Sequence, residues 1–189
     1  FRKIVVRGDT DFALTEYFDR WRYDFRLYRP IFQFARENGI PLVALNIDRD
    51  ITDGVKQGGM ESLSATQKAQ LPDEIDRGDE AYHARLREIF QQHPGATEEK
   101  FESFLQIQLL WDESMAERAA DWLQNHPRGN MVILAGSGHI LYGSGIPNRL
   151  SRRLEVTSSS VINLSQGVPL GSDLGDFAIL SSKQELPPS

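Results

Sequence analysis

Two short apolar runs restrict the fold of this chain more than any other feature, at residues 41–46 and 130–136. Each run is continuous and bounded by turn residues, which is the pattern of a parallel strand buried on both faces. Further β-rich pieces lie within 154–164, and 177–180 has the composition of a last edge strand. Because helical segments alternate with these strands, we predict an α/β fold in which helices flank a mainly parallel sheet.

Helical segments separate the two runs. One is expected over 28–38, ending at the glycine that follows. A second is expected over 79–92, with its apolar residues on one face. A third should begin at a Thr97 cap and continue to about Asn125, a length of roughly 40 Å. The second and third helices together form a long helical insertion in the α/β fold.

Composition excludes several classes of protein. The 189 residues include no cysteine, which excludes disulfides, thiolate metal sites and covalent CxxCH haem attachment. The net charge is −6 and the basic residues are scattered, which argues against a nucleic-acid surface. We expect one domain over 1–180 and a tail over 181–189. The chain opens with neither Met nor a signal peptide, so we expect it to begin inside a longer precursor.

The glycine-rich segment 135–147 is the main candidate site, because it follows an expected buried strand, where open α/β sheets place ligands. It contains two side chains suited to chemistry, His139 and Tyr142. Imidazole serves as a general base or metal ligand, and phenolate binds ferric iron. The alternative is that His139 only caps the turn and Tyr142 packs beneath it. The spacing fits neither a dinucleotide-binding loop nor a P-loop.

Two glycines and an arginine also belong to this candidate site by position. Gly136 and Gly138 allow close backbone approach. Pro147 can start a helix that carries Arg149.

Two other segments are weaker candidates. Gln108 and Asp112 are four residues apart, so on a helix they share a face with Trp111 and Met115. This polar pair needs partners, either a ligand or a neighbouring helix. The aromatic residues of 21–30 are expected in the core. The alternative for Tyr28 and Arg29, which precede a helix, is that they face a cleft, where an arginine can bind an anionic ligand.

Four segments in this order resemble the ChaN family of the Tiki/TraB and erythromycin-esterase superfamily. They are 21–31, 40–46, 108–116 and 136–147. ChaN proteins are iron-regulated, haem-binding lipoproteins, so the resemblance implies non-covalent haem binding in haem or iron uptake or storage. Members of the family usually begin with a strand that carries acidic and histidine residues, and no such segment occurs in this chain.

The resemblance implies roles for the candidate residues. We expect Tyr142 to be the ferric ligand with His139 hydrogen-bonding nearby, and the opposite assignment remains the alternative. The other expected cofactor-binding residues supply glycine backbone, pocket wall or propionate contacts: Gly136, Gly138, Gln108, Trp111, Asp112, Met115, Arg149 and Arg29.

The resemblance also implies a place in the cell and partners. We expect the bacterial cell envelope, either periplasm or outer membrane, with membrane contact only through a lipid anchor outside this chain. Expected partners are haem, a second copy in a homodimer and an outer-membrane haem receptor, but not nucleic acid. The competing hypothesis is a metal-dependent or His139-dependent hydrolase of the same superfamily. A weaker third one is a structural or signalling module that binds a partner through the long helix.

Overall fold

The computed structural model describes residues 23–165 and 171–181. These residues belong to two compact units divided after residue 44, and each unit is described by itself. In the smaller unit, a 3₁₀ turn at Phe25–Leu27 precedes helix α2, Arg29–Glu37. Helix α2 has a proline in its first turn and ends shortly before Gly39, whose φ is 62°. The predicted helix over 28–38 is therefore confirmed.

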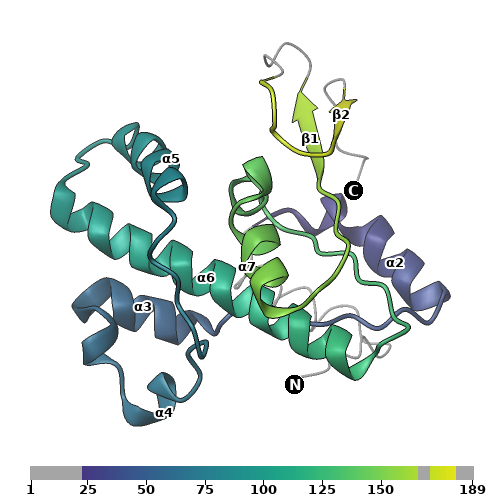
Figure 1. Ribbon diagram of the computed structural model, residues 1–189, viewed down its shortest axis with the longest axis horizontal. Coiled ribbons are helices and arrows are strands. Elements are labelled where there is room, and N and C mark those ends of the chain that lie inside the picture. Colours follow the sequence, from purple (N-terminus) through teal and green to yellow (C-terminus); the bar gives the residue numbers. More distant parts are fainter. Residues whose placement is uncertain (1–22, 166–170, 182–189) are drawn as a thin grey trace. The chain divides into compact units, whose positions relative to one another are not determined.

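Helix α6, Glu98–Asn125, is the spine of the larger unit (Figure 1). It begins where expected, because the side chain of Thr97 accepts a hydrogen bond from the Lys100 amide at 3.4 Å. Its first turn is acidic, which suits the positive end of the helix dipole. The predicted long helix is confirmed at both ends.

Three of the shorter helices, α3 (Arg49–Gly58), α5 (Glu80–Gln91) and α7 (Ile146–Arg153), pack along α6 (Figure 1). Helix α5 starts after an Asp79 cap and confirms the helix expected over 79–92, and α7 has Pro147 in its first turn. The short helix α4 spans Ala65–Lys68. Three groups of buried apolar side chains lie against α6 where it meets α3, α5 and α7. Among the described helices, none is both long and apolar enough to cross a bilayer.

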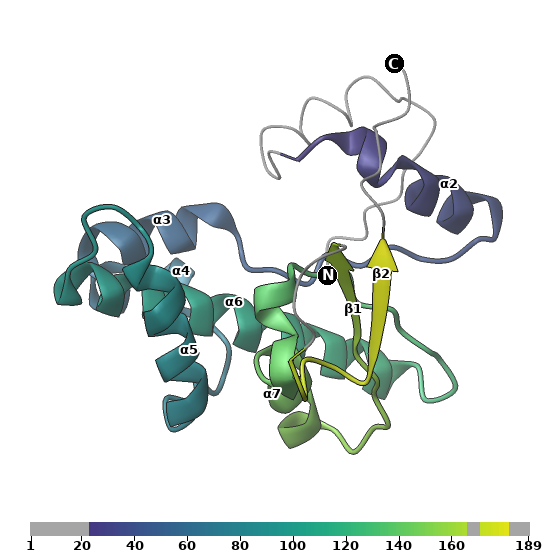
Figure 2. The same ribbon diagram turned by 90° about the horizontal axis from the view of Figure 1, so that it is seen from above.

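The described sheet consists of two parallel strands, β1 Val161–Ser165 and β2 Phe177–Ser181. They run side by side with Val161 opposite Phe177 (Figure 2). Strand β2 confirms the predicted edge strand, and the parallel pairing makes the chain a mixed α/β protein.

The prediction that 41–46 and 130–136 are buried parallel strands is wrong. In the first run the structure shows only an isolated bridge, at Val43. The second run forms no ladder with any described residue, and its burial alternates. Val132 is 86% exposed, whereas Met131, Ile133 and Ala135 pack on the core between α6 and α7. Only one side of this run is therefore covered by described residues. Its continuous apolar sequence had indicated burial on both sides.

Candidate functional site

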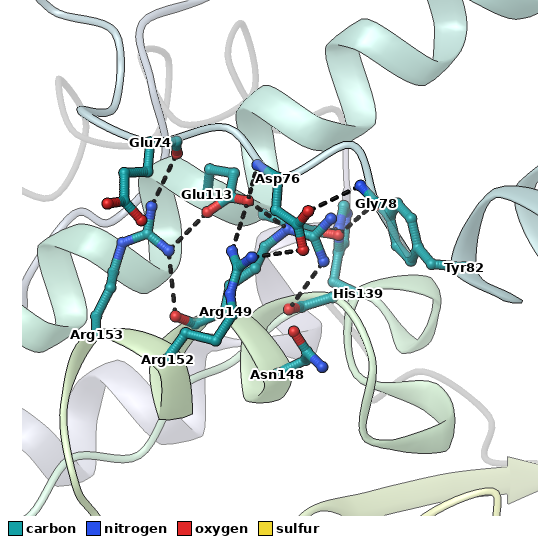
Figure 3. Close-up of polar contacts among 12 residues, drawn as sticks. Glu74, Asp76, Gly78, Tyr82, Glu113, His139, Asn148, Arg149, Arg152 and Arg153 are labelled. Carbon is teal, nitrogen blue, oxygen red and sulfur yellow. Dashed lines mark hydrogen bonds and ion pairs between the residues drawn. The ribbon is translucent and has the colours of Figure 1, made fainter. Parts of the chain in front are cut away.

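Helix α6 buries two adjacent carboxylates, Asp112 and Glu113, with no exposed surface on either. Successive residues of a helix point in directions about 100° apart. The two carboxylates therefore meet different surroundings, and Figure 3 shows Glu113 among the arginines of α7. Asp112 meets Tyr82 of α5 and His139 of the glycine-rich segment, whereas Glu113 meets arginines of α7.

Asp112 joins the two aromatic side chains by short hydrogen bonds. The hydroxyl of Tyr82 donates to Oδ2 of Asp112 at 2.6 Å, and Nδ1 of His139 lies 2.5 Å from Oδ1. Because an ionised carboxylate only accepts, Nδ1 is the protonated nitrogen of His139 in this arrangement. Its Nε2 then has a free lone pair, and it has no hydrogen-bond partner among the described residues. Asp112 thus fixes the orientation of the imidazole through Nδ1, as carboxylates do for histidines in metal sites and in general-base catalysis.

Tyr82 is held as a neutral phenol. Burial is the main cause that raises the pKa of its hydroxyl, followed by the negative charge of Asp112 and the hydrogen bond between them. Arg85 and Arg149 act in the opposite direction, but their effect is smaller. Tyr82 therefore donates to Asp112 over the physiological pH range.

Gly145 allows the glycine-rich segment to approach Asp112. Its φ is 68°, and a Cβ there would lie 2.3 Å from the carbonyl oxygen of His139 and 3.0 Å from Oδ2 of Asp112. Only glycine fits this position. By contrast, a Cβ at Gly136 would make an ordinary contact with His139, and one at Gly138 would meet nothing within 4 Å.

Glu113 fixes α7 to α6. Its Oε1 lies 3.1 Å from Nε of Arg149 and 3.0 Å from Nη2 of Arg152, and its Oε2 lies 2.6 Å from Nη1 of Arg153. The amide of Asp76 also donates to Oε1 at 2.9 Å. A buried carboxylate with three cations is well compensated, and removing it would leave buried positive charge.

A cleft of about 200 Å³ lies between α5 and the glycine-rich segment. Its walls are mostly apolar, with two phenols, one cation and one carboxylate. The lining residues are Tyr82, Arg85, Leu86, Glu88, Ile89, Gly138, Leu141 and Tyr142.

Tyr142 lines this cleft in a conformation that is unusual for a tyrosine. Its φ and ψ are 61° and 24°, the left-handed region that bulky side chains rarely adopt. The side chain is 46% exposed, and the backbone amide donates to the Leu174 carbonyl at 3.0 Å. Strain of this kind persists only where surrounding structure enforces it, and it concentrates at functional sites.

Arg85 crosses the cleft towards the same tyrosine. Its guanidinium carbon lies 5.0 Å from the ring centroid of Tyr142 and 5.9 Å from that of Tyr82. Its Nη2 donates to the hydroxyl of Ser144. Among the described residues, Arg85 forms no ion pair.

Comparison with protein families gives one match: the model for "Haem-binding uptake, Tiki superfamily, ChaN" covers residues 7–150. The chain belongs to the ChaN family. No curated protein and no solved structure matches the chain significantly. The resemblance inferred from the sequence motifs is thereby confirmed.

This ChaN protein brings only some of the expected residues together. The Trp111 ring meets the His139 ring edge-on, with centroids 6.0 Å apart, beside Asp112. Tyr142 lies in the cleft, which His139 does not line. Within the described ranges, 23–165 and 171–181, no group of three or more His, Asp or Glu side chains is arranged to hold a metal ion.

Four further residues were expected at the site: Met115, Arg149, Gln108 and Arg29. Met115 is 7% exposed in the core between α6 and α7, and Arg149 is 1% exposed in its ion pair with Glu113. Gln108 is partly buried on α6. Arg29 begins α2 in the smaller unit of the chain.

Sequence reasoning missed Tyr82, Arg85 and Glu113 as parts of the site. By its spacing Tyr82 belongs to the apolar face of its helix, and its partner Asp112 is 30 residues away in the sequence. Glu113 had one available signal, because two adjacent acidic residues inside an apolar helix both need buried partners. No signal in the sequence pointed to Arg85.

Proposed function

We propose that this ChaN protein binds haem non-covalently in the cleft between α5 and the glycine-rich segment, with Tyr142 as the ferric ligand. The observation that carries the proposal is the strained Tyr142 phenol in an apolar cleft beside Arg85. A ferric porphyrin needs an apolar surface, an axial ligand and a cation for its carboxylates. Leu86 and Ile89 would supply the apolar surface, Tyr142 the axial ligand and Arg85 the cation.

The size of the cleft limits how the porphyrin would lie. Sites for whole drug-sized ligands are about 300–1,000 Å³, and this cleft has about 200 Å³. We therefore infer that one edge of the macrocycle enters the cleft. The rest would lie outside it, which is compatible with the proposed homodimer covering the exposed part.

The protein's own residues have separate tasks in this proposal. Tyr142 provides a phenolate oxygen, a ligand that ferric haem accepts. His139 is held by Asp112 and fixes the segment that carries Tyr142. The bound group supplies the iron that the protein takes up or stores.

We further propose that the protein works in haem or iron uptake at the bacterial cell envelope. The family description, haem-binding uptake, supports this assignment. A lipid anchor outside this chain and an outer-membrane haem receptor as partner belong to the same proposal.

The proposal is tested by titrating the full-length protein with haemin and recording its absorption spectrum. We expect a saturable shift of the Soret band and a phenolate charge-transfer band. Tyr142→Phe should abolish the charge-transfer band, and Tyr142→His should restore coordination with a different spectrum. His126→Ala is the matched control for His139→Ala, because His126 stacks on Trp122 at the end of α6. If the shift of the Soret band is lost in His139→Ala and unaffected by Tyr142→Phe, and no phenolate charge-transfer band is seen, the ligand assignment is reversed.

A hydrolase is the second candidate function, favoured by the bond between Asp112 and His139. A buried carboxylate on Nδ1 leaves Nε2 able to accept a proton from an attacking water. Hydrolysis of an ester panel that is lost in both Asp112→Asn and His139→Ala, and unaffected by Tyr142→Phe, would support it. Activity that is equal in all variants would exclude it.

A further inference from the structure

Arg85 is a cation in the cleft that has only neutral partners among the described residues. They are the hydroxyl of Ser144 and the rings of Tyr82 and Tyr142. Arg87 on the same helix differs, because it pairs with Glu98 and lies over the ring of Phe101.

The guanidinium has hydrogen-bonding capacity that these partners do not use. Nη2 of Arg85 donates to Ser144, whereas Nε and Nη1 meet no acceptor in the part of the chain that the structure describes. The guanidinium lies over the rings of Tyr82 and Tyr142, which restrict its position, so less conformational entropy is lost when it binds a ligand. A planar guanidinium matches a carboxylate by two parallel hydrogen bonds.

The surrounding charges define what the cleft accepts. Asp112 and Glu113 are buried and already bonded to other groups, and Arg149 is paired with Glu113. Glu88 lies at the cleft surface without an ion pair to Arg85. The cleft thus offers an uncompensated cation next to the apolar side chains of Leu86, Ile89 and Leu141, which complements an apolar molecule with a free carboxylate.

We propose that Arg85 binds a carboxylate of the ligand and makes the cleft select porphyrins with free carboxylates over their esters. This inference rests on the proposed function, because it assigns recognition of the porphyrin edge to the same cleft. It does not depend on iron, since the carboxylate and the metal contact different side chains.

Four ligands distinguish carboxylate binding by Arg85 from iron ligation by Tyr142. They are haemin, metal-free protoporphyrin, and the dimethyl ester of each. Binding of the metal-free pair is followed by porphyrin fluorescence, and that of the haemin pair by absorption. We expect wild type to bind each free acid about ten- to a hundredfold more tightly than its ester, the range for a hydrogen bond between charged groups. Arg85→Ala should lower affinity for the acids by the same factor and leave the esters unchanged. Arg85→Lys should keep part of the preference as a point charge.

Arg87→Ala is the matched control and should bind all four ligands as wild type does. Glu88→Gln should strengthen binding of the acids by removing repulsion. If Arg85→Ala weakens acids and esters equally, or changes neither, Arg85 is a packing residue and the inference is overturned. If no porphyrin binds, it is overturned together with the proposed function. If the metal-free acid is preferred but haemin shows no iron coordination, the carboxylate site stands and ligation by Tyr142 fails.

Discussion

Asp112 of α6 and His139 of the glycine-rich segment are joined by a hydrogen bond of 2.5 Å between Oδ1 and Nδ1. The carboxylate is fully buried, and the imidazole side chain is 21% exposed. One end of His139 is thus fixed in the protein interior, whereas the rest of the ring reaches the surface. The same carboxylate binds Tyr82, so it connects α5, α6 and the segment that ends at α7.

Asp112→Ala should destabilise the protein strongly. The change leaves the Tyr82 hydroxyl and His139 Nδ1 without their acceptor, and each unsatisfied buried donor costs about 1–3 kcal/mol. We expect the free energy of unfolding in urea to fall by about 2–5 kcal/mol. Asp121→Ala, at an exposed position of the same helix, is the control and should stay within about 0.5 kcal/mol of wild type. An equal, small effect of both changes would show that the buried network contributes little.

Tyr82→Phe should change how stability depends on alkaline pH. The folded state raises the pKa of Tyr82, whereas the unfolded phenol ionises near pH 10. The contribution is therefore complete below about pH 10 and is lost as the pH rises above that value, by about 1.4 kcal/mol per pH unit. Unfolding curves between pH 8 and about 11 should show the smaller decline for the variant. A wild-type decline no steeper than that of the variant would contradict the buried, neutral phenol.

Local signals in the sequence predicted helices α2, α5, α6 and α7, but neither α3 and α4 nor the pairing of distant segments. The predicted Thr97 cap, the predicted helix over 79–92 and the predicted helix start at Pro147 depend on signals within one or two turns, and the structure confirms them. Strand pairing depends on which segments meet, so the apolar run at 130–136 was assigned to a sheet that the described residues do not form there. Glycine density drew attention to the segment that holds His139. It could not show that Asp112 would be the partner, because only folding brings them together.

Gly145→Ala should disturb this segment. A left-handed alanine costs about 1–2 kcal/mol, and the added Cβ would also collide with the His139 carbonyl. We expect a loss of more than about 2 kcal/mol in unfolding free energy and a shifted His139 resonance by NMR. Gly138→Ala serves as the comparison, because no atom lies within 4 Å of its added Cβ. Equal stability of the two variants would mean that the approach to Asp112 is not sterically constrained.

Glu113→Ala should leave three arginines of α7 without their shared carboxylate. Arg149 is 1% exposed and has no other acidic partner among the described residues. Breaking a buried ion pair from one side typically costs about 3–5 kcal/mol. Denaturant unfolding measures this loss, and adding Arg149→Met should recover part of it by removing the buried charge. If the double variant is less stable than Glu113→Ala, the arginine stabilises the fold without its carboxylate.

Replacing Tyr142 separates strain from function. Its left-handed backbone costs a tyrosine about 1–2 kcal/mol, whereas asparagine adopts this region more readily. We expect Tyr142→Asn to be more stable than Tyr142→Phe by about 1 kcal/mol in urea unfolding, because phenylalanine keeps the strain. Both variants lack the phenol, so neither should give the charge-transfer band with haemin. Greater stability together with lost ligation would show that the fold holds Tyr142 in a strained position for binding. Equal stability of the two variants would instead show that the turn tolerates an aromatic residue without cost.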